Sequence, residues 1–167
     1  PFVDFFYLDV LSSIKEIKIA LNVIEKTNLP VLVGIHILSD GKLPSGETIT
    51  KMFEKCYSKN WLGLIGACVS PEIVEKTADE MKILKIPFGF KANLWKKEPR
   101  PVGEIVKFDS AGYGGNPVDV LGTRNDITGK KFHDFSKRMI VKGATILGGC
   151  CETKPYHISA ISKLKQI

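Results

Sequence analysis

Two adjacent cysteines follow two glycines near the end of the sequence, in the run Gly148-Gly149-Cys150-Cys151. An apolar run precedes them and a helix-like run follows, so the thiols fall between a strand and a helix. Adjacent cysteines do not readily bond to each other, because the small ring strains the disulfide. Two thiolates at a strand tip can instead bind one soft metal ion, and the glycines let the backbone approach closely. The alternative is a pair of small buried hydrophobic residues.

Cys68 is the best candidate for a third ligand of such a metal ion. It follows the apolar run 62–67 and so falls at the end of another strand. Cys56 lies within the helical pattern 48–58 and is expected to be structural. The opening residues lack the pattern of a secretory leader. This favours a cytoplasmic protein whose cysteines bind metal or take part in catalysis over one with disulfides.

Three converging thiolates form a soft, anionic site that suits Zn2+. Zinc binds cysteine sulfur at about 2.3 Å, and catalytic zinc sites commonly have three protein ligands and one open position. Another thiol in that position would have its pKa lowered and would be held as a thiolate nucleophile. Cys68, Cys150 and Cys151 therefore favour alkylation of a thiol over activation of water. If no metal binds, the three cysteines are simply buried side chains.

Two histidines are weaker ligand candidates. His157 falls early in the final helical region, where its ring could approach the metal, but such a residue more often caps or packs a helix. His36 lies in an apolar strand and is expected to be a hydrogen-bonded core residue or a pocket-lining group. The three cysteines already supply a ligand set, so the zinc prediction depends on neither ring.

Apolar strand-like runs alternate with helix-like runs along the chain. Ser12 or Ser13 is expected to cap the first helix, and Ser70 the third. The predicted strands are residues 2–8, 30–38, 62–68, 87–93 and 145–149, the first turn is residues 9–13, and the predicted helices are residues 14–26, 48–58, 70–84, 131–142 and 158–167. Residues 94–126 have no regular period and predict a long functional or mobile loop, with room for a short helix.

The alternation predicts parallel βαβ units, with helices covering an apolar sheet. The pattern alone leaves two architectures open, a doubly wound open sheet and an arc of a (β/α)8 barrel. Both collect chemistry at the carboxyl ends of the strands. Cys68, Cys150 and Cys151 all fall at such ends, which supports their assignment to one site.

The net charge of +6 raises the question of a nucleic-acid partner. The lysines are spread over several helices, with glutamates between many of them, and the densest basic cluster, residues 96–100, lacks a stacking-aromatic pattern. A solvated surface that binds no nucleic acid is therefore expected. No apolar stretch approaches the ~18 residues that suggest a membrane span, so no membrane partner is expected either.

Residues 148–158 read Gly-Gly-Cys-Cys-x-Thr-x-Pro-x-His-Ile and resemble the C-terminal zinc motif of the homocysteine S-methyltransferase family. Cys68 lies where the first zinc cysteine of that family occurs. The loop 40–48 and the run Phe90-Lys91-Ala92-Asn93 are also similar to stretches of the family. The resemblance spans nearly the whole chain.

The resemblance implies methyl transfer to the thiol of homocysteine, giving methionine, on a zinc-dependent barrel. The zinc ligands that it implies are Cys68, Cys150 and Cys151. Asp9 and Asn93 would be substrate-binding residues, and the partners would be homocysteine and a small-molecule methyl donor that the residues do not identify. Two positions depart from the family pattern, since Ala67 replaces an asparagine and Asp9 replaces a glutamate that binds the homocysteine amine.

A complete barrel needs roughly 250 residues, whereas this sequence has 167 and begins with Pro rather than Met. The resemblance covers about strands four to eight, so we expect residues 1–167 to form a single partial domain, the C-terminal portion of a TIM barrel. Such an arc leaves two edges and an apolar inner face uncovered. This predicts a homo-oligomer, and it keeps a non-catalytic zinc-binding α/β domain open as the alternative function.

Overall fold

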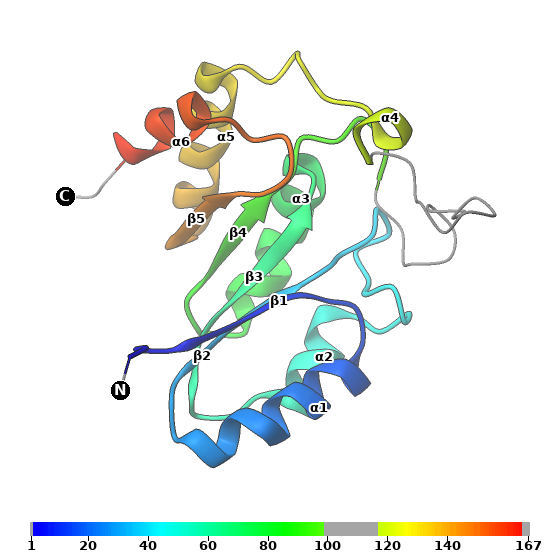
Figure 1. Ribbon diagram of the computed structural model, residues 1–167, viewed down its shortest axis with the longest axis vertical. Coiled ribbons are helices and arrows are strands. Elements are labelled where there is room, and N and C mark those ends of the chain that lie inside the picture. The colour runs from blue at the N-terminus through cyan, green and yellow to red at the C-terminus, as the bar shows by residue number, and fades with distance from the viewer. Residues whose placement is uncertain (1, 99–116, 165–167) are drawn as a thin grey trace.

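The computed structural model describes residues 2–98 and 117–164, and within them five parallel strands form one sheet (Figure 1). The strands are β1 (Phe6–Leu11), β2 (Val31–Ile35), β3 (Trp61–Val69), β4 (Phe88–Ala92) and β5 (Ile146–Gly149). The helices are α1 (Ile14–Ile24), α2 (Ile49–Cys56), α3 (Pro71–Ile83), α4 (Pro117–Leu121), α5 (Gly129–Lys142) and α6 (Pro155–Ser162), with a 3-10 turn, η1 (Glu25–Thr27), after α1. The predicted alternation of strands and helices is confirmed.

The strand order decides between the two architectures that the sequence leaves open. In a doubly wound sheet the order reverses at a switch point, whereas here the order is β1-β2-β3-β4-β5. Because parallel crossovers are right-handed, a sequential order places the connecting helices on one face of the sheet. That is the arrangement of a (β/α)8 barrel, and the described strands form an arc of one.

Side-chain caps fix where the longer helices begin. The N-cap side chains of α1, α2, α3 and α5 each accept a hydrogen bond from a backbone N–H in the first turn, which satisfies a donor that has no partner within the helix. These N-cap residues are Ser13, Thr48, Ser70 and Thr128. The expected cap at Ser12 or Ser13 is therefore confirmed at Ser13.

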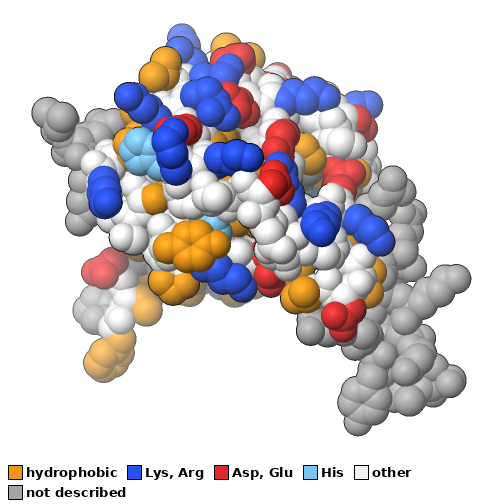
Figure 2. Space-filling model, turned by 90° about the horizontal axis from the view of Figure 1, so that it is seen from above, with side chains coloured by type: hydrophobic (Ala, Val, Ile, Leu, Met, Phe, Trp, Pro, Cys, Tyr) orange, Lys and Arg blue, Asp and Glu red, His pale blue; other side chains and the backbone are white. Residues whose placement is uncertain are grey.

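The hydrophobic core lies between the sheet and its helices. Phe90 of β4 packs against Phe132 and Phe135 of α5, with ring centroids 6.3 and 4.7 Å away. The opposite face of the sheet is less covered, since Tyr7 is 36% exposed and the side chain of Asp9 is 41% exposed. Only the helix-covered face is therefore fully packed. Figure 2 shows basic and acidic side chains mixed over one side of the molecule, in agreement with a solvated surface.

Three predicted elements are wrong at a boundary by three residues or more, and one of them is β2, predicted at residues 30–38, which ends at Ile35. The first strand is predicted at residues 2–8, but β1 runs from Phe6 to Leu11, because its backbone pairs with β2 from Phe6, opposite Val31, to Leu11, opposite Ile35. The last helix is predicted at residues 158–167, but it begins at Pro155, where a proline suits the first helical position because that N–H would have no partner. Residues 165–167 lie outside the described residues.

The predicted loop 94–126 is only partly described, because residues 99–116 lie outside the described residues. Its described ends contain α4 and an isolated antiparallel bridge between Trp95 and Thr123. The short helix for which the sequence left room is therefore present. No helix among the described residues is long and apolar enough to cross a bilayer.

Candidate metal centre

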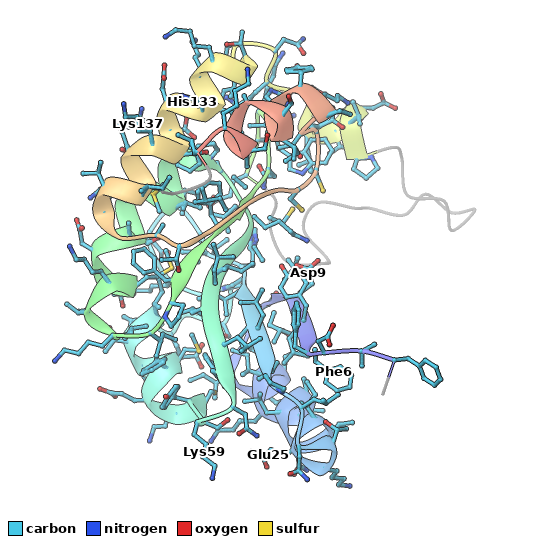
Figure 3. All side chains as sticks on the ribbon, turned by 90° about the vertical axis from the view of Figure 1, so that its left-hand side faces the viewer. Phe6, Asp9, Glu25, Lys59, His133 and Lys137 are labelled. Carbon is cyan, nitrogen blue, oxygen red and sulfur yellow. The ribbon has the colours of Figure 1, made fainter. Side chains whose placement is uncertain are left out.

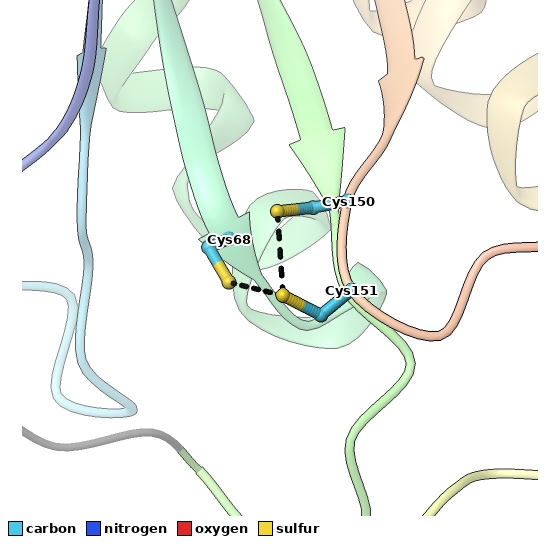
Figure 4. Close-up of side chains that lie close together, drawn as sticks. All are labelled: Cys68, Cys150 and Cys151. Atoms are coloured by element: carbon cyan, nitrogen blue, oxygen red, sulfur yellow. Dashed lines mark hydrogen bonds between the residues drawn. The ribbon is translucent and has the colours of Figure 1, made fainter. Parts of the chain in front are cut away.

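Three thiols meet at the carboxyl end of the sheet, one at the end of β3 and two just after β5 (Figure 4). The sulfurs of Cys68 and Cys151 lie 3.7 Å apart, and those of Cys150 and Cys151 lie 3.8 Å apart. All three lie within 4.8 Å of one another. A tetrahedral zinc ion with bonds of about 2.3 Å holds its sulfur ligands about 3.8 Å apart. The thiols therefore have the chemistry and the spacing that one zinc ion requires.

A β-bulge at the end of β3 directs Cys68 into this cluster. Ala67 lies opposite Lys91 and Val69 lies opposite Ala92, so Cys68 is an extra residue on β3. Its φ of 55° lies in the left-handed region, which residues other than glycine seldom adopt. A bulge re-aims a side chain out of the regular alternation of a strand. Here it turns Cys68 towards the two thiols that follow β5.

Segment 92–94, at the end of β4, holds the two adjacent cysteines from the other side. The carbonyl of Ala92 accepts a hydrogen bond of 2.7 Å from the N–H of Cys150. The N–H of Leu94 donates a hydrogen bond of 3.0 Å to the carbonyl of Cys151. Both peptide units are thus fixed to the backbone that continues from β4.

Asn93 connects the same segment to Cys68. Its side chain is fully buried, and its Nδ2 donates to the carbonyl of Cys68 at 2.5 Å and lies 3.7 Å from the Cys68 sulfur. Its Oδ1 accepts from the N–H of Trp95 at 3.2 Å. Segment 92–94 therefore contacts all three cysteines and sets the distance between them. Sequence reasoning assigned Asn93 to substrate, and this positioning role was missed.

The two glycines before the thiols differ in what surrounds them. A Cβ on Gly148 would lie 3.5 Å from its nearest neighbour, which is an ordinary contact. A Cβ on Gly149 would lie 2.8 Å from the Cβ of Thr153 and closer still to its hydroxyl oxygen. Thr153 is held there because its hydroxyl and its N–H donate to the carbonyl of Cys150, at 2.5 and 3.1 Å. Of the two glycines, therefore, only Gly149 lies where neighbouring atoms leave no room for a side chain.

Asp9 lies towards the end of the sheet that carries the thiols. In Figure 3 it lies on the side away from His133 and Lys137 of α5. Its two carboxylate oxygens have different partners. The hydroxyl of Tyr7 donates to Oδ1 at 2.6 Å, and Nζ of Lys91 donates to Oδ2 at 2.5 Å. Sequence reasoning singled out Asp9 but missed both partners, although strand alternation places Tyr7 and Asp9 on one face of β1.

Cys150 is the most acidic of the three thiols. A hydrogen bond from the Cys68 thiol, together with the nearby charge of Lys91, outweighs burial and lowers the pKa of Cys150 to about 6. The same contact with Cys150, and burial, raise the pKa of Cys68 above its usual value. Burial and the charge of Cys150 raise the pKa of Cys151. The site therefore holds one thiolate near neutral pH, and a bound cation would favour loss of the other two protons.

His157 lies early in the last helix, as predicted, whereas His36 lies just after β2 and not within the predicted strand 30–38, and neither belongs to the thiol cluster. In His157, Nδ1 accepts from the N–H of Lys154 at 2.9 Å and Nε2 donates to the carbonyl of Ile127 at 2.8 Å. Both ring nitrogens are thus used in capping α6 and fixing it to the preceding segment. His36 is buried and lines a pocket of about 190 Å³ beside Asn93. Cys56 is buried at the end of α2, as expected of a structural residue.

The fold and the thiol site together define a partial barrel with a cluster of three cysteines that could hold a metal ion. The sequence model of the homocysteine S-methyltransferase family matches residues 1–164, and the chain belongs to this family. It is 27% identical over 142 residues to Homocysteine S-methyltransferase 1 of Zea mays, an alignment that covers 84% of this chain and 39% of the maize protein. The protein of the same name from Arabidopsis thaliana is 26% identical, with 83% and 38% covered.

The fold is shared with the crystal structure of the homocysteine methyltransferase MmuM from Escherichia coli in its apo form. The TM-score is 0.65 at 15% sequence identity, and the match covers 97% of this chain and 49% of that chain. The chain therefore spans less than half the length of each of these relatives. The predicted C-terminal barrel fold is confirmed by this likeness and by the strand order.

Proposed function

We propose that Cys68, Cys150 and Cys151 bind one zinc ion, and that this centre serves methyl transfer from a small-molecule donor to the thiol of homocysteine, giving methionine. The observation that carries the proposal is the three-sulfur cluster with tetrahedral spacing in a chain of this family. The maize and Arabidopsis relatives are named for homocysteine S-methyltransfer.

The residues of the chain would contribute positioning and charge. Bound zinc would lower the pKa of a thiol in its fourth coordination position and so supply a thiolate nucleophile. Cys150 offers the first anionic ligand, and Asn93 keeps Cys68 in reach of it. Asp9 and Asn93 are the proposed substrate-binding residues, because Asp9 on β1 and Asn93 after β4 lie towards the edge of the sheet at which the thiols meet.

Metal content and product formation test this proposal. The purified chain is expected to bind one zinc ion, and Cys68→Ser, Cys150→Ser and Cys151→Ser are each expected to reduce that stoichiometry. Cys56→Ser is the matched control, since this buried cysteine lies outside the cluster. Incubation with homocysteine and S-methylmethionine or S-adenosylmethionine is expected to yield methionine. A purified chain that binds no zinc would refute the metal centre.

A non-catalytic zinc-binding α/β domain is the second candidate. It rests on the three-cysteine cluster alone and requires no substrate contact. Stoichiometric zinc without methionine formation from either donor would support this candidate over the enzyme.

We further propose that residues 1–167 form one partial barrel domain that self-associates. Among the described strands, β1 pairs only with β2 and β5 only with β4, so each has an open edge. A stable monomer in light scattering at micromolar concentration would refute self-association. A cytoplasmic role in methionine biosynthesis fits the proposed reaction, because closely spaced free thiols persist in reducing compartments.

A further inference from the structure

A polar network crosses the inner face of the sheet beside the thiols. Asp9 receives a hydrogen bond on each carboxylate oxygen, from Tyr7 at 2.6 Å and from Lys91 at 2.5 Å. The ammonium of Lys91 also lies 5.4 Å from the centre of the Tyr7 ring. Burial and the neighbouring carboxylate raise the pKa of Tyr7, so its hydroxyl keeps its proton and acts as a donor.

Small residues on the intervening strands make this contact possible. Asp9 is on β1 and Lys91 is on β4, so β2 and β3 lie between them. On these two strands the neighbouring residues are Gly34 and Ala67, and a Cβ on Gly34 would lie 2.9 Å from both the Tyr7 hydroxyl and the Ala67 Cβ. A larger residue at either position would separate the two charged groups. The sheet is therefore shaped to let them meet.

The network adjoins the proposed metal centre. Ala67 directly precedes Cys68, and Lys91 pairs with Gly148, two residues before Cys150. A ligand thiol at the centre would carry its other groups towards this face. Its α-ammonium would seek a carboxylate, but the carboxylate of Asp9 already binds an ammonium of the protein itself.

We propose that Lys91 is a specificity-determining residue. Its ammonium binds the carboxylate of Asp9 at the position where the α-ammonium of a thiol amino acid would otherwise bind. The inference rests on the proposed function and concerns which thiols the site prefers. An incoming α-ammonium must displace Lys91 and then lie beside a second positive charge. A carboxylate on the ligand, in contrast, is attracted by Lys91. The site therefore binds thiol carboxylic acids with similar affinity whether or not they carry an α-amine.

Calorimetric titration of the zinc-loaded chain tests this with L-homocysteine and with 4-mercaptobutyrate, which is homocysteine without its amine. The wild type is expected to bind both with Kd values within about threefold. Lys91→Met is expected to shift the preference towards homocysteine by about tenfold, because Asp9 can then bind the ligand amine. Lys91→Met combined with Asp9→Asn is expected to abolish that preference.

Lys142→Met is the matched control, because Lys142 forms an ion pair of 2.9 Å with Asp79 away from the thiols. It is expected to leave the preference as in the wild type. The inference is overturned if the wild type already prefers homocysteine by about tenfold, or if Lys91→Met leaves the ratio unchanged.

A second measurement needs no thiol to bind. Acylation of individual lysines, followed by mass spectrometry, is expected to proceed several-fold more slowly at Lys91 in the wild type than in Asp9→Asn. Equal rates would overturn the inference, because the ion pair would then not occupy Asp9 in solution. If acylation behaves as expected but no variant binds either thiol, the occupancy of Asp9 stands and the proposed function fails.

Discussion

Gly149→Ala is expected to displace the turn that carries both adjacent thiols. The new Cβ would lie 2.8 Å from the Cβ of Thr153, whereas carbon atoms normally approach to about 3.5 Å. Thr153 cannot turn aside without breaking its hydrogen bond of 2.5 Å to the carbonyl of Cys150. The turn must therefore move by roughly 0.7 Å, the difference between the two separations.

The expected cost follows from that displacement. Overpacking of this kind typically destabilises by about 1–3 kcal/mol, which for a chain of this size lowers Tm by roughly 2–12 °C. Because the turn carries two of the three proposed ligands, zinc affinity is expected to fall by about 10–100-fold, as it does when groups that orient metal ligands are lost.

Gly148→Ala is the matched control, since its Cβ would meet nothing closer than 3.5 Å. Scanning calorimetry and competition with a chromophoric zinc chelator compare the two variants. Replacing Thr153 by Gly in the Gly149→Ala background removes the crowding atoms and is expected to restore part of both losses. If Gly149→Ala matches Gly148→Ala in Tm and zinc affinity, the crowding argument is wrong.

Three further changes test other parts of the structure. Asn93→Ala removes the side-chain bonds to Cys68 and leaves buried groups unpaired, so chemical denaturation is expected to record a loss of about 2–4 kcal/mol; an unchanged midpoint would contradict this role. Arg138 bonds to Glu75 at 2.7 Å and lowers the pKa of that carboxylate. The ion pair therefore stabilises the fold above the unfolded pKa of about 4.3, and this stabilisation is lost as the pH falls through the lower pKa of the folded state. Glu75→Gln is expected to reduce the free energy of unfolding by under about 1 kcal/mol at pH 7 and not at all near pH 2. A loss of stability that persists at low pH would argue against the pair. Lys85, exposed after α3, has a φ of 57°, so Lys85→Gly is expected to raise stability by about 1 kcal/mol, and a lower Tm would count against backbone strain there.

Periodicity and residue type were sufficient to predict the alternation of elements and the meeting of the thiols. In a parallel sheet all carboxyl ends lie at one edge, so placing Cys68 and Cys150 at strand ends also places them near each other. The direction of Cys68 was not predictable, because its bulge has a positive φ that no glycine or asparagine signals. Val10 adopts the same conformation at the irregularity in β1, for which the residue type gives no indication.

The start of α6 was predictable but was missed. Pro155 is a standard first helical residue, and His157 lies at the position that can accept from the N-cap N–H. The pairing of Asp9 with Lys91, in contrast, was not predictable from the sequence. These residues are 82 positions apart, and their contact depends on the small side chains between them, which no local pattern reveals.

β4 connects the metal centre with the network on the inner face. Because side chains alternate along a strand, Phe90 packs into the core while Lys91 reaches the inner face of the sheet. Segment 92–94, which follows Lys91, contacts all three cysteines. A shift of β4 would therefore change the spacing of the thiols and the Lys91–Asp9 contact together. Bound zinc, as proposed, would fix that spacing and with it the position of Lys91. On this reasoning, Lys91 is expected to acylate more slowly in the zinc-loaded chain than in the metal-free chain, and equal rates would mean that β4 does not couple the two sites.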